Sequence, residues 1–251
     1  MTAPINQIIR VTNAWRLFGR ELQERALAGV SLTVAAGDFL CLAGPSGSGK
    51  TTLLNLMGAL DLPTEGQVEL LGQETSGLSL RQRALLRRRH LGFIFQAYNL
   101  IPVLSVFENV EYPLILAGRE PSERTRLVTQ ALEVVGIAEH GGKRPGELSG
   151  GQQQRVAVAR AIAGRPSIIL ADEPTASLDS KTGAALMELL HGLNQQLATT
   201  FVFSSHDPNV IQQARRIVTL QDGQVTSDWR AESLPRPAAA PAAPAAKPSA
   251  G

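Results

Sequence analysis

The chain has 251 residues, of which 43% are hydrophobic and 18% are charged, and its mean hydropathy is close to zero. These values are typical of a folded globular protein and exclude a disordered or fibrous one. The formal charge of +2 does not indicate nucleic-acid binding: without Arg236 and Lys247, near the C-terminus, 22 basic residues remain beside 22 acidic ones.

The sequence contains no apolar run of about 18 residues, so we expect no membrane-spanning helix. The first residues, MTAPINQIIR, lack the basic and apolar regions of a secretory signal. A single cysteine, Cys41, excludes an internal disulfide. Together these features predict a cytosolic protein.

Taken in chain order, the hydrophobic patterns predict an α/β fold. Short β-branched runs predict strands at 8–12, 30–34, 38–44, 66–72, 91–96, 167–172, 199–205 and 216–220. Helical patterns lie at 50–60, 79–88, 106–117, 122–135, 151–163, 180–197 and 207–213. The late alternation predicts a parallel sheet, and the early strands predict an antiparallel layer. We expect one domain over 1–234, with an inserted helical subdomain at about 97–164.

The segment 235–251 differs from the rest in composition. It contains five prolines and eight alanines. Proline removes amide donors and clashes with helix, while alanine buries little surface. We therefore expect a disordered tail.

The strongest motif is GPSGSGKT, which follows an apolar strand and opens a helix. Its glycines let backbone amides turn inward and form an anion cradle with the helix N-terminus. A lysine would face the β- and γ-phosphates, and a threonine hydroxyl would contact Mg²⁺. The predicted phosphate-binding residues are Gly44, Pro45, Ser46, Gly47, Ser48, Gly49, Lys50, Thr51 and Thr52.

A second strand, in IILADEP, ends at two carboxylates. Asp172 at the carboxyl edge of a strand beside the phosphate loop could hold Mg²⁺. Glu173 could orient or deprotonate the attacking water. With the phosphate loop, these residues indicate a P-loop nucleotide hydrolase with a RecA-like core.

The segment LSGGQQQR opens another helix, for which Ser149 is a suitable N-cap. Its exposed amides form a second anion-binding helix start. One chain could bind two anions, or two chains could face each other so that each helix start completes the partner's site. The residues alone leave both arrangements open.

The four segments GPSGSGKT, LSGGQQQR, IILADEP and SSHD occur in the order seen in the ATP-binding cassette (ABC) family of transport ATPases, which the sequence resembles over about residues 5–226. The resemblance implies ATP and Mg²⁺ as ligands and a head-to-tail dimer of two copies with ATP between them. It also implies that Gln96 contacts Mg²⁺ and the γ-phosphate. The residues Ser149, Gly150, Gly151 and Gln152 would bind the partner chain's ATP. Asp179 would contact the opposite phosphate loop, and His206 would act as the switch histidine beside Lys50 and Glu173.

The family places an early aromatic residue against adenine, and this part of the pattern matches less well. Phe18 is the nearest candidate and Trp15 the other. Either ring could stack on a base, and either could belong to the core.

The family resemblance also implies membrane permease subunits as partners, at the cytoplasmic face of the inner membrane, and no nucleic acid. The segment NLIPVLSVFENV resembles most closely the lipoprotein-releasing and macrolide-exporter ATPases, which predicts export or lipoprotein extraction. The alternative is a non-transport ATPase that drives a cell-division or envelope-remodelling complex. A third class, the soluble cassette ATPases of translation or DNA repair, fits less well because this cassette is single and uninterrupted.

Two surface features bear on the partner. Apolar residues near Gln96 could receive a helix of the permease, or they could pack the subdomain's own core: Ile101, Val103, Leu104, Val106 and Phe107. The arginine cluster RQRALLRRRH (81–90) is interpreted as a solvated helix face, with an anionic membrane or the partner as the alternative contact.

Overall fold

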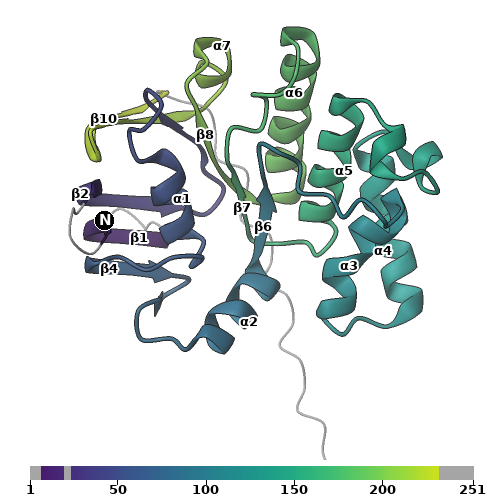
Figure 1. Cartoon of the computed structure of the whole chain (residues 1–251), viewed down its shortest axis with the longest axis horizontal. Coiled ribbons are helices and arrows are strands. Elements are labelled where there is room, and N and C mark those ends of the chain that lie inside the picture. The colour runs from purple at the N-terminus through teal and green to yellow at the C-terminus, as the bar shows by residue number, and fades with distance from the viewer. Residues whose placement is uncertain (1–6, 20–23, 232–251) are drawn as a thin grey trace, which may run out of the picture.

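A computed structural model describes residues 7–19 and 24–231, so the predicted tail lies outside the described residues (Figure 1). Its centre is a six-stranded sheet in the order β10-β9-β3-β8-β7-β6. All neighbours in this sheet run parallel except β9 and β10. The strands are β3 (Phe39–Ala43), β6 (Leu91–Ile94), β7 (Ile168–Ala171), β8 (Thr200–Ser205), β9 (Arg216–Gln221) and β10 (Gln224–Arg230).

A second, antiparallel sheet has the order β2-β1-β4-β5. Its strands are β1 (Gln7–Phe18), β2 (Glu24–Ala35), β4 (Glu65–Leu70) and β5 (Gln73–Glu74). Helix α1 (Lys50–Met57) packs against strands of both sheets. The sequence therefore predicted the parallel core and the antiparallel layer correctly.

The remaining α-helices are α2 (Leu80–His90), α3 (Val106–Leu116), α4 (Pro121–Val134), α5 (Gly150–Ile162), α6 (Ser180–Leu197) and α7 (Pro208–Ile211). Helices α3 to α7 pack in the hydrophobic cluster on the other side of the central sheet (Figure 1), whereas α2 shares the cluster of α1 through Leu86. The segment 97–164, which is described throughout, contains helices and no strand. Helices α3, α4 and α5 pack on one another, and α5 also contacts β6.

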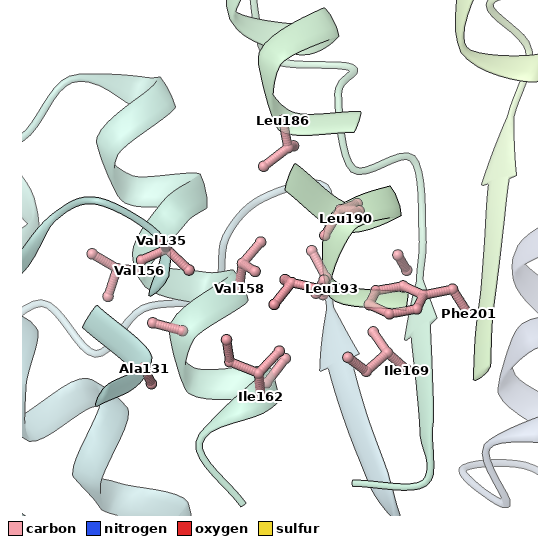
Figure 2. Close-up of a cluster of buried hydrophobic side chains, with 14 of the residues drawn as sticks. Ala131, Val135, Val156, Val158, Ile162, Ile169, Leu186, Leu190, Leu193 and Phe201 are labelled. Atoms are coloured by element: carbon pink, nitrogen blue, oxygen red, sulfur yellow. The ribbon is translucent and has the colours of Figure 1, made fainter. Parts of the chain in front are cut away.

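Strand alternation in β3 divides the core in two. Phe39 and Cys41 face one hydrophobic cluster, and Leu40 and Leu42 face the other. Figure 2 shows part of the first cluster, where α5 and α6 pack on β7 and β8. Burial raises the pKa of the Cys41 thiol to about 12, so this side chain is a core residue and no thiolate nucleophile.

The structure departs from the predicted elements mainly in its antiparallel strands. Strand β1 is 12 residues long, whereas the pattern predicted only 8–12, because register shifts between Val11 and Leu17 interrupt the alternation of apolar residues. Strand β10 was not predicted because most of it is exposed and carries no apolar periodicity. Strand β5 is only two residues long.

Candidate functional site

The chemistry-bearing segments lie together because parallel strands end at one edge of the sheet. The phosphate loop (44–51) follows β3, Asp172 and Glu173 follow β7, and His206 follows β8. These segments border a cleft of about 460 Å³, which we call the phosphate cleft. It is lined by Phe18, Glu24, Arg25, Ala26, Ser46, Gly47, Gly49, Lys50, Thr51, Thr52, Gln96, Glu173 and His206.

Two glycines of the phosphate loop are fixed by close approach of backbone. A Cβ on Gly44 would lie 2.2 Å from the carbonyl oxygen of Leu220, and one on Gly49 would lie 2.5 Å from that of Ala26. Gly47 has open space around it, but its φ of 79° favours glycine. The loop therefore presents bare backbone to the cleft.

Lys50 is buried at the base of the loop, with 6% of its surface exposed. Its Nζ donates to the carbonyl oxygens of Gly44 (2.8 Å) and Pro45 (2.9 Å). Nζ also lies 3.8 Å from Oε1 of Glu173. The ammonium group is thus held at the loop with a carboxylate nearby, where a phosphate could take over its hydrogen bonds.

The Asp172 carboxylate joins three elements. Its Oδ1 accepts hydrogen bonds from Oγ1 of Thr51 (3.1 Å) and from Oγ of Ser204 (2.6 Å). Ser204 Oγ also accepts from the amide of Glu173 (2.9 Å). Sequence reasoning missed Ser204, because only the neighbouring positions of β7 and β8 in the sheet bring it to these carboxylates.

Glu173 and His206 contact each other at the edge of the cleft. Nδ1 of His206 lies 2.9 Å from Oε1 of Glu173. Glu173 has a φ of 45°, which is uncommon for a residue with a side chain. The backbone of Glu173 is therefore held in this conformation by its surroundings, including the Ser204 bond, so that its carboxylate points between Lys50 and His206.

The residues present fit a magnesium-bound nucleotide. In the described ranges, no group of three or more His, Cys, Asp or Glu residues could hold a metal alone. Mg²⁺ at nucleotide sites is held by one or two protein oxygens together with phosphates and water, and Asp172 and Thr51 supply such oxygens. The buried Oγ of Ser48 has no hydrogen-bond partner among the described atoms, so an acceptor in the loop would satisfy it.

The segment 148–155 lies apart from the phosphate cleft of its own chain. Ser149 caps α5 through a capping box, in which its Oγ accepts from the amide of Gln152 and the Gln152 side chain accepts from the Ser149 amide. None of the residues lining the cleft belongs to this segment. A Cβ on Gly151 would lie 2.6 Å from the Thr182 side chain, so the glycine allows α5 and α6 to approach closely.

Asp179 precedes α6 and is its N-cap. Its carboxylate accepts from the hydroxyl of Thr182 (2.6 Å) and from the amides of Lys181 and Thr182. These hydrogen bonds hold the pKa of the Asp179 carboxyl below its usual range. Within one chain, Asp179 thus shapes the start of α6, and the structure shows no contact between it and a phosphate loop.

Phe18 lines the phosphate cleft, whereas Trp15 does not. The Trp15 ring packs near Gly29 of β2, within the β-layer. Three further lining residues, Glu24, Arg25 and Ala26, were not predicted, since they gain their position only from the pairing of β2 with the end of β1.

The fold and the phosphate cleft define a P-loop nucleotide hydrolase. Residues 27–176 match the family model described as ABC transporter. The chain is 44% identical over 219 residues to an ABC transporter ATP-binding protein of Methanocaldococcus jannaschii, covering 87% of this chain and 97% of that protein. It is 43% identical to the macrolide export ATP-binding/permease protein MacB of Burkholderia thailandensis, covering 91% of this chain and 34% of MacB.

Among solved structures, the ATP-binding cassette MJ0796 in a dimeric, post-hydrolysis state bound to ADP and Pi superposes with a TM-score of 0.84 at 41% identity. The match covers 90% of this chain and all of that one. The chain therefore belongs to the ABC transporter family and is one of its ATP-hydrolysing, ATP- and Mg²⁺-dependent subunits. No helix in the described part of the chain is long and apolar enough to cross a membrane.

Proposed function

We propose that the phosphate cleft binds MgATP and that Glu173 activates the attacking water. The observation that carries this proposal is the convergence of Lys50, Glu173 and His206 on one cleft, with Nζ 3.8 Å and Nδ1 2.9 Å from the same carboxylate oxygen of Glu173. Glu173 is the base, His206 orients it, and Lys50 binds phosphate. Phe18 stacks on adenine, and Asp172, Thr51 and Gln96 hold Mg²⁺, which neutralises phosphate charge when bound.

We further propose that two chains join head to tail. The segment 148–155 offers an anion-binding helix start, yet it lies outside the phosphate cleft of its own chain. Ser149, Gly150, Gly151 and Gln152 therefore complete the cleft of a second copy, with Asp179 beside them. The dimeric state of MJ0796 supports this arrangement.

A cross-linking experiment tests the head-to-tail arrangement. Chains carrying Ser46→Cys are mixed with chains carrying Ser149→Cys, and Cys41 does not interfere because it is fully buried. With a thiol-specific bifunctional reagent long enough to span the bound nucleotide, we expect a cross-linked pair at twice the 26.8 kDa chain mass in the mixture with MgATP, and little in either variant alone. Equal cross-linking of each variant with itself would contradict a head-to-tail dimer.

For the membrane partner, we propose a groove of about 620 Å³ between the sheet and the helices of 106–164. Its apolar floor includes Phe93, Phe95 and Leu114. Four arginines and two glutamates line it as well: Arg88, Arg89, Arg119, Arg160, Glu120 and Glu123. The partner segment is therefore a short helix of a permease subunit with apolar and acidic side chains, at the cytoplasmic face of the membrane.

The structure favours the second of the two alternatives for the apolar residues near Gln96, namely packing in the protein's own core, and it refines the interpretation of the arginine cluster. None of the five apolar residues named for partner contact lines the groove, and Val106 is fully buried in the protein's own core. The arginine cluster of α2 is only partly solvated, because Arg87 donates to the carbonyl of Ala59 (2.6 Å) and Arg88 to that of Leu116 (2.6 Å).

Substitution of Arg89 tests whether the groove binds the permease, because Arg89 is exposed and lines the groove. We expect Arg89→Glu to reduce copurification of the permease at least about threefold, as expected for repulsion at a desolvated contact. The control is Arg81→Glu, on the same helix but outside the groove. ATPase activity of the isolated chain should remain unchanged in both variants, and equal permease capture by the two would contradict the groove.

The relationship to MacB, which is named for macrolide export, supports a role in export. The alternative role, extraction of lipids or lipoproteins, rests on the sequence resemblance of residues 99–110 alone. The chain spans about a third of that protein, whose name joins ATP-binding and permease functions. We propose that this chain powers a permease of that kind, with closure of the two chains on ATP as the force-generating step.

A further inference from the structure

The guanidinium group of Arg16 lies over the ring of Phe18, which lines the phosphate cleft. The guanidinium carbon of Arg16 lies 4.5 Å from the centroid of the Phe18 ring. The two side chains meet where strand β1 is irregular, with a register shift between Arg16 and Leu17. A guanidinium at this distance from a ring centroid makes a cation–π contact.

Arg16 is itself held from its other side. Its Nε donates to Oδ2 of Asp61 at 2.7 Å, and both side chains are about a quarter to a third exposed, at 25% and 30%. Asp61 thus fixes the orientation of the guanidinium, and the guanidinium limits the positions open to the Phe18 ring.

Phe18 lines the phosphate cleft, whereas Arg16 is not among its lining residues in the described part of the chain. The Phe18 residue remains 41% exposed despite the arginine. The contact therefore leaves part of the ring open towards the cleft, in the place proposed above for the adenine base.

We propose that Arg16 is a positioning residue for the base of the nucleotide. Its guanidinium orders the Phe18 ring before the base arrives, which reduces the entropy lost on stacking. The charge also lies against the π-system on which the base stacks. This inference rests on the proposed stacking of Phe18 on adenine. It adds Arg16 as the residue that orders the Phe18 ring for that stacking.

The backbone at the end of β1 is held in place without the side chain of Arg16. The amide of Leu17 donates to Oγ1 of Thr64 (3.1 Å), and the amide of Thr64 donates to the carbonyl of Trp15 (2.7 Å). These bonds hold the end of β1 to the segment 61–64 without the arginine side chain. A substitution of Arg16 should therefore leave the protein folded.

The test distinguishes an effect on binding of the base from an effect on binding of the phosphates. MgADP and magnesium pyrophosphate are titrated calorimetrically into the full chain and into Arg16→Met, which keeps side-chain length but loses the charge. We expect the Kd for MgADP to rise about threefold, the size of an exposed cation–π contact. The Kd for pyrophosphate should stay unchanged, and Arg16→Lys should recover most of the ADP affinity.

A double-variant cycle with Phe18→Leu completes the test. In the Phe18→Leu background, Arg16→Met should change the Kd for MgADP by less than about 1.5-fold, because the ring through which it acts is gone. An undiminished threefold effect there, or an equal loss of pyrophosphate binding, would overturn the role of Arg16 while leaving Phe18 in place. If Phe18→Leu alone binds MgADP as well as the unmodified chain, the stacking role of Phe18 itself is wrong, and that of Arg16 with it.

Discussion

Replacement of Glu173 by glutamine is expected to lower ATP turnover by at least about 100-fold, because an amide cannot accept the proton of the attacking water. Binding should survive, since glutamine keeps the size of the side chain and Lys50 keeps its two loop carbonyls. The ATP-bound dimer should then accumulate because it no longer decays by hydrolysis. Size-exclusion chromatography with MgATP measures the dimer, and phosphate release measures turnover.

The matched control for Glu173→Gln is Glu69→Gln. Glu69 is a partly exposed glutamate of β4 that pairs with Arg10 at 3.6 Å and lies outside the cleft. This control should keep the turnover of the unmodified chain and form no persistent dimer. Near-normal turnover in Glu173→Gln would assign the catalytic base to another residue.

Replacement of Lys50 by alanine is expected to weaken MgATP binding by more than about tenfold and to remove ATPase activity. The side chain is buried at the loop, so its charge acts on phosphate with little screening by water. Its loss also leaves the Glu173 carboxylate without its nearest lysine, which further disfavours an anionic ligand. Fluorescence titration with a labelled ATP analogue measures the affinity.

Lys143→Ala serves as the comparison for Lys50→Ala, because Lys143 is exposed and does not line the cleft. It should bind the analogue as the unmodified chain does. An unchanged affinity in Lys50→Ala would show that the anion cradle lies elsewhere.

Much of the fold could be predicted because the relevant signals are local. Strands β3 and β7 are fully buried and consist of apolar residues only, and β8 contains the buried apolar run Phe201–Phe203. The phosphate loop carries glycines whose positions the backbone demands, as at Gly44 and Gly49. Such segments specify their own structure and, once the strands are parallel, their place at one edge of the sheet.

The residues that were missed depend on contacts between distant segments. Ser204 reaches Asp172 only because β7 and β8 are neighbours, and a serine at the end of a strand carries no signal of this. Arg16 likewise meets Asp61 through the pairing of β1 with β4, across a register shift that hides the strand's periodicity. The partner groove is assembled from α2, β6, α3 and α5, so no single pattern marks it.

The central claim is that each ATP is bound by the phosphate loop of one chain and the segment 148–155 of another. Its most direct test measures ATPase activity in a mixture of two inactive variants, Lys50→Ala and Ser149→Arg. A mixed dimer contains one site built from the intact loop of the Ser149→Arg chain and the intact Ser149 of the Lys50→Ala chain. We predict that mixing restores activity that neither variant has alone. A mixture as inactive as its components, in which mixed dimers are shown to form, would contradict the shared site.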